Sequence, residues 1–202
     1  AGYGLGTVLL LAAVIPVLPA RTLGLIPIAI IINSVVGEIV GSIGLPLYLD
    51  SVGTVLVAAL AGPVAGMATG ALNNVVWGLL NPAALPFAAG AALVGWLAGV
   101  FIHRFNAFRN IGTVIGFGIV LGIVGGMVAA PVAAYVYGGT AGVGTGALVS
   151  LFREMGGSLI ASVTTQAFIS DPVDKVIVML VAYATVKALP KRTVAAFAPQ
   201  HA

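Results

Sequence analysis

Residues 51–103 read SVGTVLVAALAGPVAGMATGALNNVVWGLLNPAALPFAAGAALVGWLAGVFIH and contain no Asp, Glu, Lys or Arg. A second stretch, residues 110–152, also lacks these four residue types. Soluble domains carry a charged residue at roughly one position in four. Two uncharged stretches of this length predict that most of the chain lies within a lipid bilayer.

The composition of the whole chain agrees with this prediction. Of its 202 residues, 60% are hydrophobic and only 6% are charged. The apolar stretches are long and unbroken, whereas outer-membrane barrels show alternating segments of about ten residues. A spanning helix needs about 20 apolar residues. We therefore predict an all-α polytopic membrane protein with almost no extramembrane domain.

Glycine, proline and charged residues divide the predicted core, residues 21–192, into six spans. Gly62-Pro63 interrupts an apolar stretch that is too long for one span, because proline breaks the helical hydrogen-bond ladder. Asp171-Pro172 is interpreted as a helix start at the membrane surface. The predicted spans are residues 23–43, 52–61, 64–80, 84–102, 111–137 and 173–189.

The basic residues predict the orientation of these spans. Arg21, the loop at residues 103–110 and the Lys191-Arg192 pair fall on one side if the six spans alternate, and cytoplasmic loops are enriched in Lys and Arg. We therefore expect these residues in the cytoplasm, and Asp50 and Gly139 outside.

Three segments lie beyond the six spans. Residues 1–20 are predicted to hold a peripheral or short spanning helix. Residues 147–169 are predicted to be a re-entrant or interfacial helix or helical hairpin, because a full crossing would place Lys191 outside. Residues 193–202 are predicted to be a cytoplasmic tail, so the C-terminus is expected inside.

Glycines recur at the four-residue spacing of one helix face. Gly62, Gly66 and Gly70 are one example. Such stripes allow helix backbones to approach closely in lipid. They predict either packing within this chain or a surface that docks onto a partner membrane subunit.

Polar residues inside the predicted spans are candidates for ligand binding, because a charge at the bilayer centre costs about 3 kcal/mol even on the most lenient scale. Amide and carboxylate groups beside flat aromatic rings suit a small, planar, polar solute. Adjacent Asn73 and Asn74 point about 100° apart on a helix, so one of them should matter more than the other. The candidate binding residues are Glu38, Asp50, Asn73, Asn74, Trp77, Asn81, Tyr135, Glu154 and Gln166.

Structural roles remain open for several polar residues. Asn33 has the alternative of a hydrogen bond to a neighbouring helix. Asp171 and Asp174 are interpreted as the polar start of a helix, where a carboxylate interacts favourably with the helix dipole.

Several kinds of chemistry are not expected. The chain has no Cys and two well-separated His residues, so no metal site is predicted. No Gly-Lys-Ser/Thr follows the glycines, so no nucleotide site is predicted. We expect no enzymatic activity, no cofactor and no nucleic-acid partner.

The order of features resembles the substrate-binding S components of energy-coupling-factor transporters. The resemblance is carried by the loop Leu45-Pro46-Leu47-Tyr48-Leu49-Asp50, the helix break at Gly62-Pro63, the polar Asn73-Asn74 and the last span that ends Leu189-Pro190-Lys191-Arg192. It implies a six-helix core in a bacterial or archaeal cytoplasmic membrane. It also implies a vitamin-, nucleobase- or nucleoside-like substrate bound near the outer face.

The same resemblance implies partners. S components assemble with a transmembrane T subunit and two ATPases, often through an Ala-xxx-Ala pair on the first core helix. This chain has Ala29-xxx-Asn33-xxx-Gly37 at that place, and we predict docking through these residues together with Gly62 and Gly66. The alternative function is an ion- or proton-coupled secondary transporter with Glu38 and Glu154 as carriers.

Overall fold

The computed structural model describes residues 2–139 and 142–198. Every regular element in these ranges is helical, which confirms the all-α prediction. The α-helices are α1 (Gly2–Val14), α2 (Ala20–Ser42), α3 (Val52–Ala61), α4 (Pro63–Trp77), α5 (Ala88–His103), α6 (Ile111–Tyr137), α7 (Val143–Glu154), α8 (Leu159–Ala188) and α9 (Lys191–Phe197). Short 3-10 helices are η1 (Ile15–Val17), η2 (Pro82–Phe87) and η3 (Ala107–Arg109).

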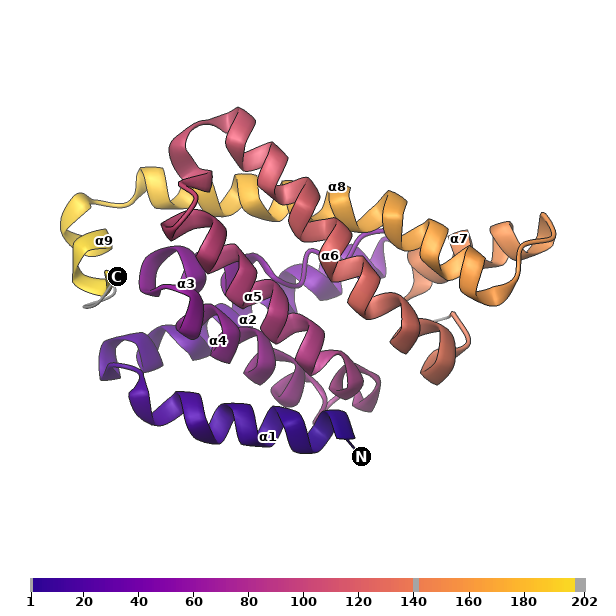
Figure 1. Cartoon of the computed structure of the whole chain (residues 1–202), viewed down its shortest axis with the longest axis horizontal. Helices are drawn as coiled ribbons and strands as arrows, with labels where there is room; N and C mark the ends of the chain where they lie inside the picture. The colour runs from indigo at the N-terminus through magenta and orange to yellow at the C-terminus, as the bar shows by residue number, and fades with distance from the viewer. Residues whose placement is uncertain (1, 140–141, 199–202) are drawn as a thin grey trace.

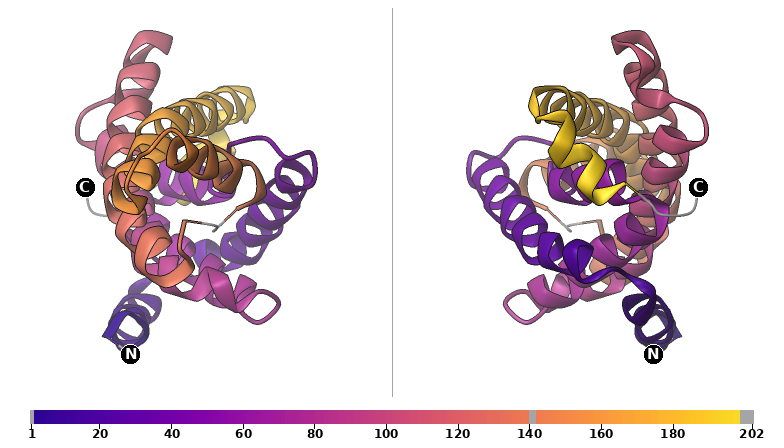
Figure 2. Two further views of the ribbon diagram at one scale, coloured as in Figure 1. Left: turned by 90° about the vertical axis from the view of Figure 1, so that its right-hand side faces the viewer. Right: turned by 90° about the vertical axis from the view of Figure 1, so that its left-hand side faces the viewer.

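The helices α2, α3, α4, α5, α6 and α8 run alternately in opposite directions along the long axis of the molecule (Figure 1). The α3–α4 reversal needs only Gly62, whose φ of 90° is a conformation that side chains with a Cβ rarely adopt. In the end-on views (Figure 2), α1 lies outside the other helices. It packs against α4 and α5.

Helices α4 and α5 meet backbone to backbone. A Cβ on Gly66 would collide with the Gly95 carbonyl, and a Cβ on Gly70 would collide with the Ala91 carbonyl. Because Gly66 faces Gly95 while Gly70 faces Ala91, the two helices are antiparallel. The glycine stripe of α4 is therefore used for packing within the chain.

A second glycine stripe joins α6 to α8. Gly118 lies against Val176, Gly122 against Pro172, and Gly126 against the Asp171 carboxylate. In lipid, where apolar burial does not drive helices together, such close van der Waals contact is a main source of association. This contact places the middle of α8 beside the central helices.

The predicted helix start at Asp171-Pro172 is wrong. Helix α8 begins after Ser158, whose hydroxyl accepts from the Ala161 N–H at 3.3 Å, and continues through Pro172 to Ala188. Proline is tolerated inside membrane helices when neighbouring elements support the interrupted ladder, and here Pro172 packs on Gly122 of α6. Asp171 and Asp174 are consequently buried in mid-helix rather than solvated at a helix end.

The predicted segment 147–169 is divided between two helices. Helix α7 ends at Glu154, and α8 turns back from residue 159 and packs against α7. Residues 159–169 are therefore continuous with the predicted last span, and a membrane-dipping role for the hairpin of α7 and the start of α8 stays a prediction. The hairpin projects at one end of the molecule (Figure 1).

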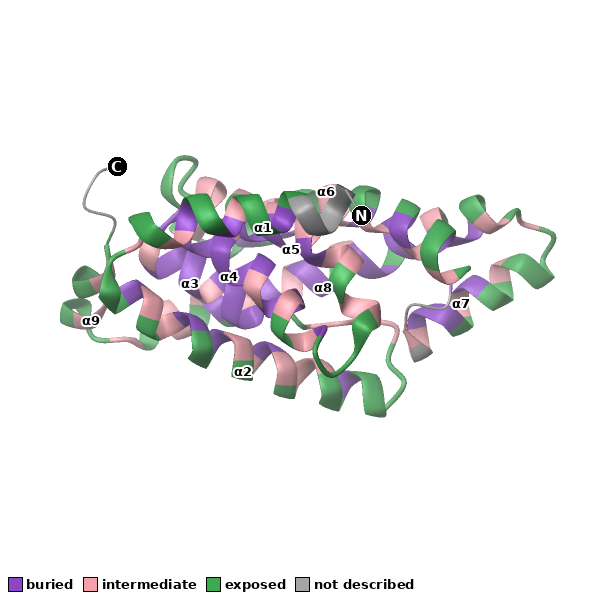
Figure 3. Cartoon of the chain, turned by 90° about the horizontal axis from the view of Figure 1, so that it is seen from below, coloured by how far each residue is buried: buried purple, intermediate pink, exposed green. Residues whose placement is uncertain are grey.

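The outer surface is apolar along much of its length. Ile28, Ile31, Val35 and Ile39 form an exposed stripe on α2, and exposed positions alternate with buried ones along this helix (Figure 3). Within the described residues, three helical segments are long and apolar enough to cross a membrane: Ala20–Ser42, Pro82–His103 and Ile111–Tyr137. These features are compatible with a membrane protein, whereas the six-span arrangement remains a prediction.

The segments that carry most of the basic residues gather at one end of the molecule. The α1–α2 junction with Arg21, the α5–α6 connection with Arg104 and Arg109, and α9 all lie there (Figures 1 and 3). The opposite end carries α7 and the connections that follow α2 and α4. Residues 193–198 of the predicted tail form most of α9 and the residue that follows it. Residues 199–202 lie outside the described ranges.

The α4–α5 contact leads to a prediction. Gly66→Leu should lower the yield of folded protein and its thermal midpoint, because overpacking a tight contact costs about 1–3 kcal/mol or more. Gly116→Leu on α6 is the matched control, since no atom lies within 4 Å of a Cβ built there. Size-exclusion profiles and thermal unfolding of the two purified variants provide the measurement. Equal stability would contradict the packing role of Gly66.

Candidate binding cavity

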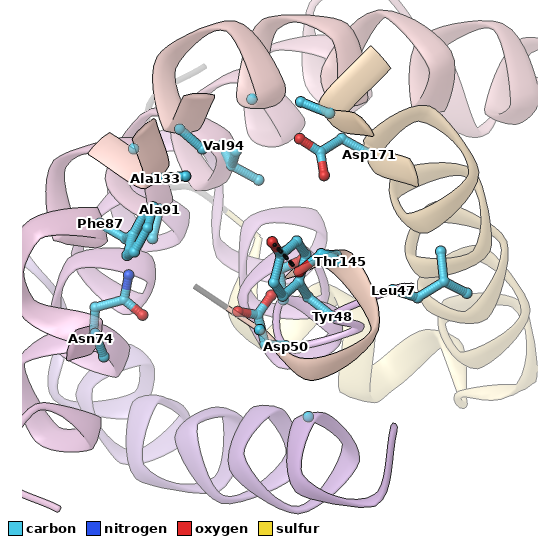
Figure 4. A pocket seen from close by; sticks show the side chains of 18 of the residues that line it. Leu47, Tyr48, Asp50, Asn74, Phe87, Ala91, Val94, Ala133, Thr145 and Asp171 are labelled. Carbon is cyan, nitrogen blue, oxygen red and sulfur yellow. Dashed lines mark hydrogen bonds between the residues drawn. The ribbon is translucent and has the colours of Figure 1, made fainter. Parts of the chain in front are cut away.

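A cavity of about 300 Å³ lies among α2, α4, α5, α6 and α8, between the connection at residues 43–51 and the start of α7. This volume is at the lower end of the range for small-molecule sites. Figure 4 shows Asn74 on one wall, Asp171 on another, and Asp50 beside Tyr48 and Thr145. Six of the nine predicted binding residues line it: Asp50, Asn73, Asn74, Trp77, Asn81 and Gln166.

A buried amide network supports the α4 wall. The Asn33 amide nitrogen donates to Thr54 Oγ1 at 2.9 Å and to Asn73 Oδ1 at 3.2 Å, and Asn33 Oδ1 accepts from the Gly53 N–H at 2.6 Å. Asn33 has 0% exposure. It therefore joins α2 to α3 and α4, in agreement with the alternative of a hydrogen bond to a neighbouring helix.

Asn73 and Asn74 have different roles, as expected for adjacent residues on a helix. Asn73 is tied to Asn33 and donates to Asn74 Oδ1 at 3.3 Å. The Asn74 side chain projects into the cavity (Figure 4). Its amide nitrogen donates to no group of the described chain, so it is the one of the pair that is free to contact a ligand.

The opposite wall carries charge. Asp174 is fully buried and accepts from the Tyr48 and Leu49 N–H groups at 2.9 and 2.7 Å, while its second oxygen forms an ion pair with Lys175. The two backbone bonds hold Leu49 at a φ of 47°, a conformation that is uncommon for a residue other than glycine. Asp174 thus anchors the 43–51 connection to α8.

The connection itself closes one side of the cavity. The Tyr48 hydroxyl donates to Thr145 Oγ1 of α7 at 3.1 Å, and burial raises the pKa of this phenol to about 12. Asp50 points into the cavity (Figure 4). Withdrawal from bulk water raises the pKa of its carboxyl group, and the attraction of Lys175 opposes this effect.

Three predicted binding residues do not line the cavity. Glu38, Tyr135 and Glu154 are exposed, with Tyr135 at 79%. Helical phase explains Glu38. The cavity face of α2 consists of Asn33, Gly37 and Gly41 at four-residue spacing, and the residue after Gly37 is turned about 100° away from it.

Asn81 lines the cavity but also caps η2, since its side-chain oxygen accepts from the Ala83 N–H at 3.1 Å. Trp77 lies between Asn74 and Asn81 and lines the same wall.

The residues predicted to dock a partner are engaged within the chain. Ala29 packs against Gly53, Gly62 against Gly99, and Gly66 against Gly95. Asn33 is in the amide network and Gly37 lines the cavity. Docking of a partner subunit through these residues stays a prediction.

Sequence reasoning missed Asp171 and Lys175 as cavity residues. A signal was present: Ala167, Asp171 and Lys175 recur at four-residue spacing, which continues one helix face through Pro172. This spacing was not recognised because Pro172 was interpreted as the start of a helix.

Within the described residues, no cluster of three or more His, Asp or Glu could hold a metal ion. Comparisons of the chain with protein-family models, curated proteins and solved structures find no match. The function must therefore be argued from the site itself.

The amide network gives a second prediction. Asn33→Ala should lower the thermal midpoint clearly, because it leaves buried polar partners unsatisfied at about 1–3 kcal/mol each. Asn74→Ala should have a much smaller effect on stability, since Asn74 accepts a single bond at 3.3 Å. Thermal unfolding in detergent measures both. A larger loss for Asn74→Ala would reverse these assignments.

Proposed function

We propose that the chain is a membrane-embedded solute-binding subunit of an importer, of the S-component type that its sequence resembles. The observation that supports this most directly is the cavity. It is lined by the 43–51 connection, the end of α4 and the start of α7, which lie toward the end of the molecule opposite the basic segments (Figure 1). It presents hydrogen-bonding groups that have no partner among the described residues. Its volume of about 300 Å³ suits a vitamin-, nucleobase- or nucleoside-like solute.

The proposed orientation follows from the charge distribution. The end that carries Arg21, Arg104 and α9 would face the cytoplasm, as the positive-inside bias favours. Helices α2, α3, α4, α5, α6 and α8 would then be the six core spans, and the cavity would open toward the outer face. The C-terminus would be cytoplasmic, in a bacterial or archaeal cytoplasmic membrane.

The proposed partners are a transmembrane T subunit and two ATPases. Concentrating a solute requires an energy source, and the sequence contains no phosphate-binding glycine loop of its own. The proposed division of labour is capture by this chain and energy supply by the partners.

A second function, ion- or proton-coupled transport, is favoured by one observation. Asp171, Asp174 and Lys175 are ionisable residues in the middle of an apolar helix, and such residues often mark proton or ion pathways. They replace Glu38 and Glu154 as the carriers that this alternative would need.

Binding and accumulation distinguish the two functions. Native mass spectrometry of the gently purified chain should detect a retained small molecule. In vesicles, the chain alone should bind this molecule without concentrating it, and concentration should require the T subunit, the ATPases and ATP. Concentrative uptake by the chain alone under an imposed proton gradient would favour the second function.

The orientation has its own test. The chain has no Cys, so a single introduced Cys is a unique label site. Arg104→Cys and Lys191→Cys should resist an impermeant thiol reagent in intact cells, whereas Leu80→Cys, in the exposed connection after α4, should react. Membrane permeabilisation should make the first two reactive and serves as the control. Labelling of Lys191→Cys from outside would contradict the proposed orientation.

A further inference from the structure

We infer that the solute carries a positive charge, which Asp50 and Asp171 receive from two walls of the cavity. This inference rests on the proposed solute-binding function and adds the chemical class of the solute. Asp50 comes from the connection before α3 and Asp171 from the middle of α8, and both carboxylates point into the cavity (Figure 4).

No side chain of residues 2–139 and 142–198 forms a hydrogen bond or an ion pair with either carboxylate, and the Asp50 carboxylate accepts only from its own backbone N–H. The ammonium group of Lys175 is in direct contact with Asp174, and it attracts Asp50 and Asp171 without contacting them. Asp174 in turn has both oxygens occupied, one by Lys175 and one by the Tyr48 and Leu49 N–H groups. The Asp174–Lys175 ion pair therefore leaves no Asp174 oxygen available for a solute.

The charge balance of the lining is therefore negative. Among the described residues that line the cavity, the charged side chains are Asp50, Asp171 and Lys175. Lys175 is shared by Asp50, Asp171 and Asp174, so carboxylates outnumber cationic side chains here in the described chain. Asp171 is 7% exposed, and a buried carboxylate without a close cation is costly, so a bound cation would stabilise it. Asp50 is exposed, and its carboxylate is accessible to the same cation.

Two unpartnered polar groups point independently to a ligand. Gln166 is 4% exposed and Ser51 is 8% exposed, and both line the cavity. The Gln166 amide nitrogen and the Ser51 hydroxyl have no hydrogen-bond partner in the described chain. More than about 90% of buried polar groups are paired in native structures, so a ligand acceptor for the Gln166 amide is expected beside the cationic group.

The remaining lining favours a flat molecule. Trp77 and Phe87 line the cavity, and Phe87 is stacked on Tyr137 with ring centroids 5.7 Å apart. Aromatic faces attract planar cations. The structure thus assigns the solute to the class of small, planar, protonated organic bases that also carry a hydrogen-bond acceptor.

Three probes of nearly equal size and different charge test this assignment: benzamidine, which is a cation at neutral pH, benzamide, which is neutral, and benzoate, which is an anion. Equilibrium dialysis with the full chain in phosphatidylcholine vesicles measures their binding without an anionic lipid surface. We expect benzamidine to bind at least about tenfold more tightly than benzamide, and benzoate to bind least, because hydrogen bonds between charged groups are stronger than neutral ones.

Variants connect the preference to the two carboxylates. Asp50→Asn and Asp171→Asn should each reduce the benzamidine-to-benzamide ratio by about tenfold while benzamide binding persists, which shows that the cavity is intact. Glu38→Gln and Glu154→Gln remove the same charge from exposed positions outside the cavity and are the matched controls. Their ratios should equal that of the unaltered chain.

The outcomes separate the inference from the function on which it rests. Binding of benzamide or benzoate as tight as that of benzamidine would overturn the inference and leave solute binding in place. An unchanged preference in both Asp variants would overturn the assignment to Asp50 and Asp171. No binding of any probe would count against the cavity as a solute site and so against both. If an Asp variant does not fold, the ranking of the probes on the unaltered chain still decides.

Discussion

The close contact between α6 and α8 is the interaction on which the cavity depends. Gly122 lies against Pro172, and Gly126 lies against the Asp171 carboxylate. Without side chains at these two α6 positions, the backbones approach closely enough for α8 to pass Pro172 without ending. A larger residue at either position would displace the wall that carries Asp171 and Gln166. The same small-residue contacts that pack α6 against α8 therefore also fix the position of the charged wall of the cavity.

The polar side chains of the interior divide into two groups by how completely the protein satisfies them. Asn33, Asn73 and Asp174 are held by neighbouring side chains and backbone groups, and they join α2, α3, α4 and the 43–51 connection to the rest of the molecule. Gln166, by contrast, lines the cavity with an amide nitrogen that has no partner among residues 2–139 and 142–198. In a low-dielectric environment an unused polar group costs free energy, which is why the second group indicates a ligand site and the first indicates structure.

Several features could be read from the chain without its structure. Residues 51–103 contain no charged residue and are longer than a single membrane span. An all-helical chain with an apolar surface therefore follows from composition and length alone. Gly62-Pro63 marks the α3–α4 break because proline and a positive φ are local backbone properties. The polar Asn73-Asn74 pair is conspicuous for a similar reason, since amides are rare in hydrocarbon.

Other features depended on the tertiary structure. Pro172 lies inside a helix because Gly122 of another helix supports it, and a local rule that ends helices at proline contains no information about that neighbour. Whether Glu38 or Gly37 faces the cavity depends on the rotation of α2, which its packing against α3 and α4 sets. The sequence by itself determined the helical class, the apolar character of the surface and the polar residue types. Only the tertiary structure decided which of them converge, because convergence depends on contacts between residues far apart in the chain, such as Asp50 and Asp171.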